Sequence, residues 1–536
     1  MLSAGATFVA VAPFGTAEAE AAPADYGELP GKEQIWEDML FLTSLGSRNT
    51  GFPGHVKFVD FLANRLKACP GVQVFRDTYS LPRWEATGYA LSVISAGGER
   101  QNLHATSAYP YSGKTSPEGV TGKLVDVGIT TPNEVGGSNP VPLPPDVKGK
   151  ILVLQSPVHG FPFGDNYLPL GSYLPGVTQP ERIKEAIWQN RSAPNLDQFQ
   201  KAGAAGVILV WTNVSDENAE GQYVPFGHKF AGCPTLWVGK KTGDQLKALS
   251  AQGADANITL QANIYPNTPT DTVYGILPGA RDEILLVHTH SDGPNACEEN
   301  GGIGVVALAK YLSNLPRGTL KRSYLFTMTT GHMAGAYVHS FRDFQEKHPD
   351  LMKRIVGGLV IEHLGSTMYV DRGDAYVPEG GNQPILLQTQ SKTLADLMLK
   401  SAVGSIDDRI IALSPYKHRY TGECAGPIEY GIPTIGYMPA PSYLLKESVH
   451  CGIERMDARL YRAQLENFTR VLRAMDGMTT DKLPGTVPSR GLRRGEQYLS
   501  NSALAPRRAV KGTLIGRNQR NYSINSIHYI GTVDGT

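Results

Sequence analysis

A group of histidines and carboxylates follows the apolar run at residues 284–287. If this segment is a strand, His288, His290 and Asp292 share one face, because alternate residues of a strand point the same way. Only His290 and Asp292 lie at its open end. We therefore expect His290 to bind a metal ion, Asp292 to hold its imidazole from behind, and His288 to be packed or bonded to the backbone.

Two glutamates, Glu298 and Glu299, come directly afterwards in a loop. Gly301 and Gly302 allow this loop to turn sharply into the next helix. A histidine, an aspartate and an acidic loop suit a metal site, although the same pattern also occurs at ordinary polar strand ends. This segment therefore makes a hypothesis that other residues must support.

Two further residues raise the odds of a metal site. Glu362 ends the apolar run of residues 356–361, an unfavourable place for a carboxylate unless another charge balances it. His450 lies in a loop before a helix that contains Asp457. Two histidines and two carboxylates at one sheet edge suit zinc or another divalent ion. The alternative is that His450 is a loop or cap residue and Glu362 pairs with Arg or Lys.

The elements that would position these residues alternate between strands and helices. This order predicts an α/β fold with a mostly parallel mixed sheet and helices on both faces. Ligands bind at the carboxyl ends of such strands, where the candidate residues fall. The expected strands are residues 282–292, 321–330 and 356–365, and the expected helices are residues 302–315 and 335–348.

The part of the chain before this region has two segments with different sequence patterns. Residues 33–68 have a helical pattern, and strand-like segments at residues 71–77 and 89–96 follow it. Residues 115–262 contain short β-rich pieces separated by Pro and Gly. This change predicts a small separate domain inserted into a larger one.

Composition limits the partners and the compartment. Fifty basic residues balance fifty acidic ones, so no global field attracts nucleic acid or a membrane surface. Residues 1–26 resemble a signal peptide without its basic start, which predicts a secreted protein. The basic residues of 479–536 predict a solvated extension. Five cysteines without a CxxC pair allow one disulfide, and their odd number leaves at least one cysteine unpaired.

The order of these segments resembles the M28 family of zinc aminopeptidases, in the subgroup with an inserted protease-associated (PA) domain. The resemblance rests on SLGSRNTGFPGHVKFVDFLANRL, on the β-rich pieces GKLVDVG, GKILVLQSP and CPTLWVG, on VYGILPGARDEILLVHTHSD with EENGGIGVVALAKYL, and on YGIPTIGY with ESVH. It covers about residues 35–478. It implies a peptidase domain at residues 27–114 and 263–478, and a PA-like insert at residues 115–262.

The resemblance also implies roles for single residues. His290 matches the first metal ligand and Asp292 its orienting partner. Glu299 falls at the position of a metal-bridging carboxylate, although a shift of one residue would place Glu298 there. Glu362 matches the carboxylate of the first metal, and His450 matches the histidine of the second.

The sequence departs from the family at FTMTTGHMAG. The family has two adjacent glutamates here, a general base and a ligand, where this chain has Thr329 and Thr330. Neither threonine can accept a proton near neutral pH or offset metal charge. His332, two residues on, is a substitute ligand, a substitute base, or simply a histidine in the first turn of a helix.

With Glu299 and Glu362 as the expected carboxylates, charge favours one zinc ion over two. The sequence thus predicts an exported, metal-dependent hydrolase of peptide or amide bonds that acts like an aminopeptidase. His332, Glu298 or Glu423 would take the proton. The alternative is an inactive relative that binds peptides or a partner through its cleft and PA domain. We expect the substrate to contact Tyr420, Glu423 and Tyr443.

Overall fold

The computed structural model describes residues 29–95, 97–132, 138–162, 167–175, 182–183, 187, 193–316, 318–415 and 420–485. The predicted signal peptide and most of the basic extension lie outside these residues. Within them, no helix has both the length and the apolar character that crossing a membrane requires.

A mixed and mostly parallel sheet forms the centre of the larger unit. Its four middle strands are parallel, and antiparallel strands join at its edges. This confirms the predicted fold class. In spatial order the strands are β11 (Asp255–Leu277), β13 (Arg322–Thr329), β12 (Arg281–His290), β14 (Ile355–Ile361), β19 (Thr434–Pro439), β17 (Ile385–Gln388), β18 (Ile410–Pro415) and β7 (Tyr167–Tyr173).

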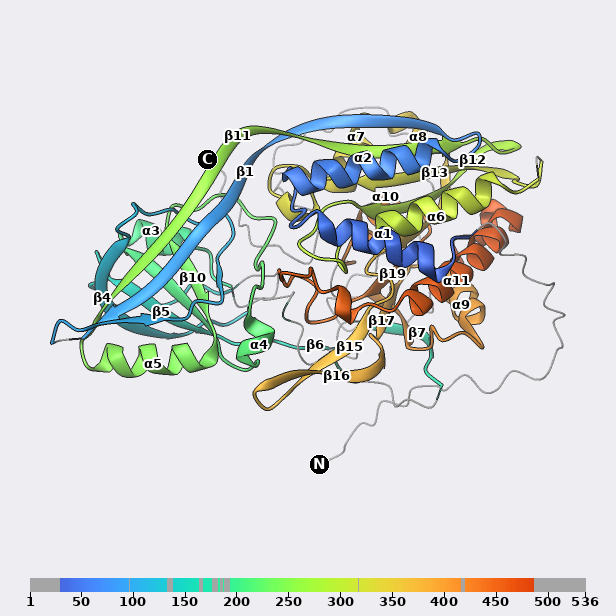
Figure 1. Ribbon diagram of the computed structural model, residues 1–536. Coiled ribbons are helices and arrows are strands. Elements are labelled where there is room, and N and C mark those ends of the chain that lie inside the picture. The colour runs from blue at the N-terminus through green and yellow to red at the C-terminus, as the bar shows by residue number, and fades with distance from the viewer. Residues whose placement is uncertain are drawn as a thin grey trace, which may run out of the picture.

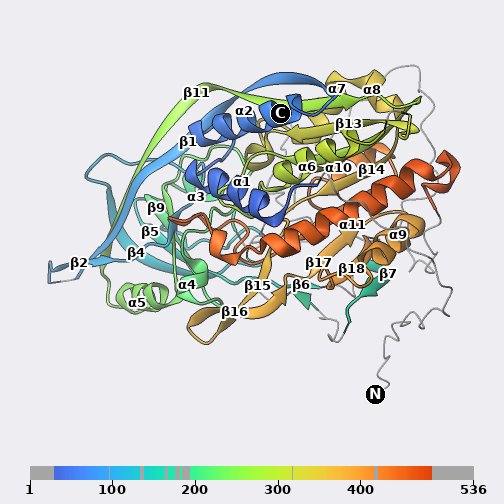
Figure 2. The same ribbon diagram turned by 45° about the vertical axis from the view of Figure 1, so that its right-hand side comes forward.

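Helices cover both faces of this sheet. Along β12, Leu285 and Val287 enter one apolar cluster while Ile284 and Leu286 enter another, as alternation in a doubly covered strand requires. Figure 2 shows α11 beside α6 and α9 on the first face. That face also has α1 and α2, and the other face has α7, α8 and α10. The bounds are α1 (Lys32–Ser44), α2 (Pro53–Lys67), α6 (Gly301–Ser313), α7 (Ser340–Lys347), α8 (Pro349–Arg354), α9 (Lys392–Ala402), α10 (Ala425–Tyr430) and α11 (Ala458–Gly477).

A smaller unit lies at one end of a long two-stranded ribbon (Figure 1). The ribbon consists of β1 (Gln73–Ile94) and β11, which pair along almost their whole length and run from one unit to the other. The strands of the smaller unit are β3 (Ser107–Ala108), β10 (Thr235–Val238), β9 (Gly206–Trp211), β5 (Ile151–Ser156) and β4 (Val120–Ile129), with α3 (Asp197–Lys201), α4 (Asp216–Ala219) and α5 (Lys240–Ala251).

The structure differs from several expectations. The helical pattern at residues 33–68 is two helices, because Gly46 and Gly51 adopt positive φ angles and Pro53 begins α2. The two strand-like segments are one continuous β1. The helix expected at residues 335–348 begins only at Ser340. The range 115–262 also supplies β7 to the edge of the larger sheet. All five cysteines are free.

Candidate metal centre

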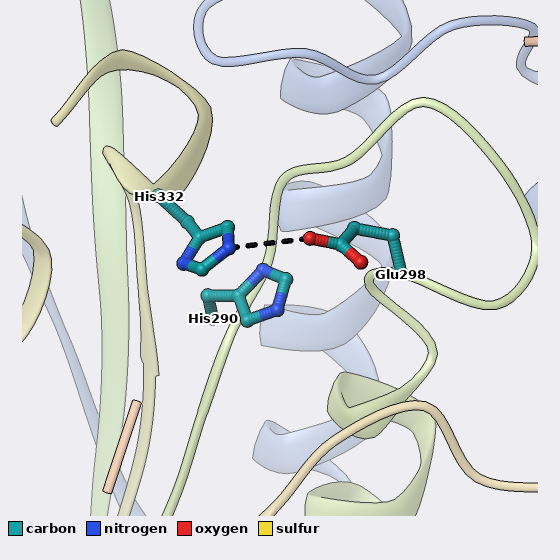
Figure 3. Close-up of side chains that lie close together, drawn as sticks. All are labelled: His290, Glu298 and His332. Carbon is teal, nitrogen blue, oxygen red and sulfur yellow. Dashed lines mark ion pairs between the residues drawn. The ribbon is translucent and has the colours of Figure 1, made fainter. Parts of the chain in front are cut away.

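Buried histidines and glutamates meet at the carboxyl ends of β12, β13 and β14. His290 ends β12, His332 follows β13, and Glu362 with His363 directly follows β14. Glu298 comes from the loop before α6. None of the five is more than 6% exposed. Figure 3 shows His290, His332 and Glu298 reaching one point from three segments of the chain.

Their ligand atoms form two overlapping groups that share His290. One group consists of His290, Glu298 and His332, and the other of His290, Glu362 and His363. Within each group, the ligand atoms lie within 4.8 Å of one another. His290 Nε2 is 3.9 Å from Glu362 Oε2, and His363 Nε2 is 3.8 Å from the same oxygen. Glu298 joins the groups, with Oε2 3.2 Å from His363 Nε2. Ligand atoms at these spacings could hold a metal ion.

Four of these buried atoms have no hydrogen-bond partner: Nε2 of His290 and of His363, and Oε2 of Glu298 and of Glu362. We call these four residues the donor cluster. His290 Nδ1 donates to the Asp292 carbonyl at 2.9 Å, and His363 Nδ1 to the Pro439 carbonyl at 2.6 Å. Because these carbonyls only accept, each Nδ1 carries a proton, and His290, whose pKa is lowered by burial, can present a lone pair at Nε2. Burial opposes a charge on His363, but Glu298 raises its pKa above the ordinary value, so a metal ion would have to displace the proton from its Nε2.

His332 has a different environment, because both of its nitrogens face carboxylates. Nδ1 lies 2.7 Å from Glu423 Oε1, and Nε2 lies 3.2 Å from Glu298 Oε1. Its ring stacks on that of His290, with centroids 4.0 Å apart. The Ser340 hydroxyl donates to Glu423 Oε2 at 2.6 Å, and His288 Nε2 lies 3.3 Å from that oxygen. A histidine between two carboxylates is suited to carry a proton.

Two unusual backbone conformations place these histidines. Gly331 has φ +102°, and a Cβ there would lie 2.5 Å from the Val338 carbonyl, so the turn that aims His332 requires glycine. His363 has φ 58°, in the left-handed region that residues other than glycine rarely adopt. Such conformations persist where surrounding contacts enforce them, often at functional sites. Here the bond from His363 Nδ1 to Pro439 is one such contact.

Burial and the neighbouring charges shift the ionisation of the group. Burial raises the pKa of Glu362 to about 7, and burial with the nearby His332 lowers the pKa of His290 to about 4. Burial acts to raise the pKa of Glu298, but His363 and His332 hold it below its ordinary value. Burial opposes the charge on His332, yet hydrogen bonds to Glu298 and Glu423 hold its pKa well above the ordinary value. Desolvation thus works against the charges of these side chains.

Three residues expected at the site lie differently. Glu299 forms a fully buried ion pair with Arg48 instead of joining the donor cluster, and burial, partly offset by Arg48, raises its pKa to about 7. Asp292 orients His290 through its backbone carbonyl, while its carboxylate accepts from the Met333 amide at 2.9 Å. His450 is exposed in a turn and is not among the residues whose ligand atoms converge. No sequence pattern indicates the path of the loop that contains His450.

The other side chains considered for the site form hydrogen bonds with other residues of the protein. The Thr329 hydroxyl bonds with Ser340, and that of Thr330 with Thr270. The hydroxyl of Tyr420 bonds with Ser414 at 3.0 Å, and that of Tyr443 donates to the Thr367 carbonyl at 2.8 Å. Glu423 contacts His332, as described above. These bonds occupy both tyrosine hydroxyls.

His363 is the member of the donor cluster that sequence reasoning missed. Neighbouring residues of a strand point to opposite faces. With Glu362 expected to face the site, His363 was therefore expected to face away from it. The positive φ angle of His363 breaks that alternation at the strand end. The only available signal was a histidine next to a carboxylate where an apolar strand ends.

Comparisons with known proteins identify the fold. No protein-family model matches the sequence, and no curated protein matches it. Solved structures do match. A peptidase M28 precursor from Shewanella amazonensis SB2B has a TM-score of 0.56 and 13% identity over 86% of this chain and 98% of its own. A zinc aminopeptidase from Bacillus subtilis has a TM-score of 0.54 and 16% identity over 84% and 96%.

An aminopeptidase from Aneurinibacillus sp. strain AM-1 matches similarly, with a TM-score of 0.53 and 16% identity over 83% of this chain and 94% of its own. The chain therefore has the fold of zinc aminopeptidases of the M28 type along most of its length. At these identities the likeness concerns the fold, and the chemistry must be argued from the residues of this chain.

Proposed function

We propose that this protein is a metal-dependent hydrolase of peptide or amide bonds, aminopeptidase-like, with one divalent ion, zinc, at the donor cluster. One observation carries the proposal: His290, Glu362 and His363 bring three buried ligand atoms without hydrogen-bond partners within 4.8 Å of one another, at strand ends of a fold shared with a zinc aminopeptidase. Burying such atoms without partners is costly, and a cation held by His290, Glu362 and His363 would satisfy three of them, with Glu298 beside it. Imidazole and carboxylate suit zinc.

A count of charges supports a single ion. Glu298 and Glu362 together offset the two positive charges of one zinc ion, with His290 and His363 as neutral ligands. Arg48 already offsets Glu299, and a protonated His332 offsets Glu423. The buried carboxylate of Asp292 would offset one charge of a second divalent ion and leave the other without a buried partner, which is unfavourable.

The chemistry then divides between the ion and His332. A bound zinc ion would lower the pKa of a water molecule towards about 7 and polarise the scissile carbonyl. His332, held protonated between Glu298 and Glu423, would donate its proton to the leaving amine and regain one from solvent. Glu423 would hold the imidazole in one orientation and stabilise its charged form. The proton of the attacking water would pass to solvent, because a zinc ion lowers the pKa of bound water to about 7, so that no glutamate base would be needed in place of Thr329 or Thr330.

The inserted domain and the signal peptide would determine access to the centre and the place of action. We propose that residues 115–262 form a PA-like lid that supplies no ligands, in keeping with the origin of both ligand groups in the larger unit. Phe226 of this range still borders the centre, with its ring centroid 5.1 Å from that of His332. The expected signal peptide supports action outside the cytoplasm.

Turnover of a peptide-amide panel tests this function. Zinc-loaded protein should release free amino acids, a chelator should abolish the release, and added zinc should restore it. His332→Gln should lower kcat by about 100-fold or more while zinc stays bound, because a general acid contributes about that much. The matched control His348→Gln alters a histidine that pairs with Asp77 away from the centre. Loss of zinc with His332→Gln would instead make His332 a ligand, and no turnover by zinc-loaded wild type would contradict the proposal.

A further inference from the structure

Arg83, on the ribbon strand β1, is a buried arginine whose hydrogen-bonding capacity the protein leaves unused. Its side chain is 9% exposed, and its Nε and Nη1 atoms have no hydrogen-bond partner. Arg322, which is fully buried, uses Nε, Nη1 and Nη2 in bonds to a carboxylate, two carbonyls and a hydroxyl. Burying an arginine for structure therefore does not by itself explain Arg83, since unused N–H groups are costly there.

Two aromatic rings hold the guanidinium of Arg83. Its Cζ lies 4.0 Å from the ring centroid of Tyr265 and 5.2 Å from that of Phe52. Such contacts favour the cation and fix the plane of the group while leaving its N–H edge available. A guanidinium held in one plane is suited to bind a carboxylate through two parallel hydrogen bonds.

The surroundings of Arg83 connect it to the metal centre. Leu81, two residues earlier, packs in one apolar cluster with Ala334, which lies two residues beyond His332. On the other side, Thr50, two residues before Phe52, donates its hydroxyl to the Asp292 carboxylate. Arg83 is thus linked on two sides, through Leu81 and through Phe52, to segments that border the donor cluster.

One carboxylate of the protein is near, and it does not satisfy Arg83. Glu85 Oε2 is 3.4 Å from Nη1, without the geometry of a hydrogen bond. The Glu85 side chain is 34% exposed, so water can solvate it when another anion binds. A ligand carboxylate with both oxygens in the guanidinium plane would make the stronger contact.

We infer that Arg83 binds a carboxylate of the peptide substrate, either the C-terminal carboxylate of a short peptide or an acidic side chain. This inference rests on the proposed function, because it concerns the substrate of the same centre. Arg83 acts here as a specificity-determining residue and takes no part in bond cleavage. The expected substrates are short peptides that carry a negative charge beyond the scissile bond.

Binding of uncleavable peptides to the zinc-loaded full chain tests this inference. The probes are leucyl-leucine analogues whose peptide bond is replaced by a methylene-amine, as free acid and as C-terminal amide, and a leucyl-glutamate analogue as amide. Calorimetry compares the wild type with Arg83→Met and Arg83→Lys. The control is Arg76→Met on the same strand, where Arg76 pairs with Asp60 and Asp271 at the surface.

The wild type and the Arg76→Met control should bind at least one charged analogue about 10-fold or more tighter than the leucyl-leucine amide. Hydrogen bonds between charged groups contribute enough free energy for a difference of that size. Arg83→Met should remove that preference, and Arg83→Lys should reduce it, because lysine lacks the planar fork. A preference for the free acid identifies the C-terminal carboxylate, and one for the glutamate amide identifies a side chain. Equal affinities in the wild type, or a preference that survives in Arg83→Met, would overturn the inference. Absence of hydrolysis with the preference intact would count against the proposed function alone.

Discussion

The two ends of strands β12 and β13 bury charge in opposite ways. At the amino end, Arg322 donates to Glu283 at 2.8 Å, to the Asp476 carbonyl at 3.0 Å and to Thr480 at 3.0 Å. At the carboxyl end, all four members of the donor cluster keep an atom without a partner. The same two strands therefore carry one charge network that the protein completes itself and one that it leaves incomplete.

This difference separates structure from function. A completed buried network contributes to folding, because each charged group finds its partner when the chain folds. An incomplete one costs stability in the absence of a ligand, and that cost becomes affinity when a cation binds. Mutations at the amino end should therefore change stability, and mutations at the carboxyl end should change metal binding or turnover.

The largest expected effect is at the amino end. Arg322→Met should lower the free energy of unfolding by about 3 kcal/mol, because it leaves the buried carbonyls of Met475 and Asp476 without their donor. Chemical denaturation measures this. The control Arg354→Met removes an exposed ion pair with Asp282 at the same end and should change stability by less than about 0.5 kcal/mol. Equal effects of the two changes would show that the Arg322 network is not the stabilising one.

A smaller effect is expected next to the donor cluster. Glu423→Gln keeps the size of the side chain but removes the charge that orients His332. Turnover should fall by about 100-fold, less than for loss of a triad carboxylate, because His332 keeps Glu298 as a second partner, and one zinc ion should stay bound. Kinetics and metal analysis of the same sample measure both. If zinc is lost while turnover per bound ion is unchanged, Glu423 supports the ligands and not the proton transfer by His332.

The smallest effect concerns Asp407, a buried carboxylate with only neutral partners. It accepts from Tyr437 at 2.5 Å and Asn467 at 2.8 Å, and burial raises its pKa to about 6. Because the folded pKa exceeds the unfolded value of about 3.9, its contribution to stability is complete below that value and is lost as pH rises through about 6.

Stability relative to Asp407→Asn should therefore fall by about 2 kcal/mol between about pH 4.5 and pH 7.5. Denaturation of both proteins across that range measures the difference. A difference that does not change with pH would mean that the neutral hydrogen bonds fully stabilise the ionised carboxylate. Asp407 would then resemble the completed network at the amino end.

Much of the fold could be predicted from the sequence, because periodicity marks buried strands and amphipathic helices well. The segments around His290 and Glu362 were placed correctly at strand ends for this reason. The sequence did not predict that β1 is one continuous strand. The strand is half-exposed, its burial pattern is irregular, and bulges interrupt its pairing with β11. The split between α1 and α2 depends on glycines whose φ angles a helical pattern does not reveal.

The candidate site was less predictable because its details depend on contacts distant in sequence. Arg48 lies 251 residues from Glu299, and no local pattern announces that this carboxylate is already neutralised. The choice between Glu298 and Glu299 depends on that pairing. His363 reaches the cluster through a backbone angle, and His450 lies on a loop whose path follows packing. Spacing identified the strand ends but not which neighbouring side chain turns inward.

Metal stoichiometry tests the central claim most directly. Purified full-length protein, stripped with a chelator and reconstituted with zinc, should bind one ion per chain. His363→Ala should weaken binding by about 100-fold or more, because it removes a ligand whose free nitrogen faces the cluster. The control His104→Ala alters an exposed histidine that pairs with Glu220 and should still bind one ion. Two ions in the wild type, no ion at all, or unchanged binding by His363→Ala would contradict the account.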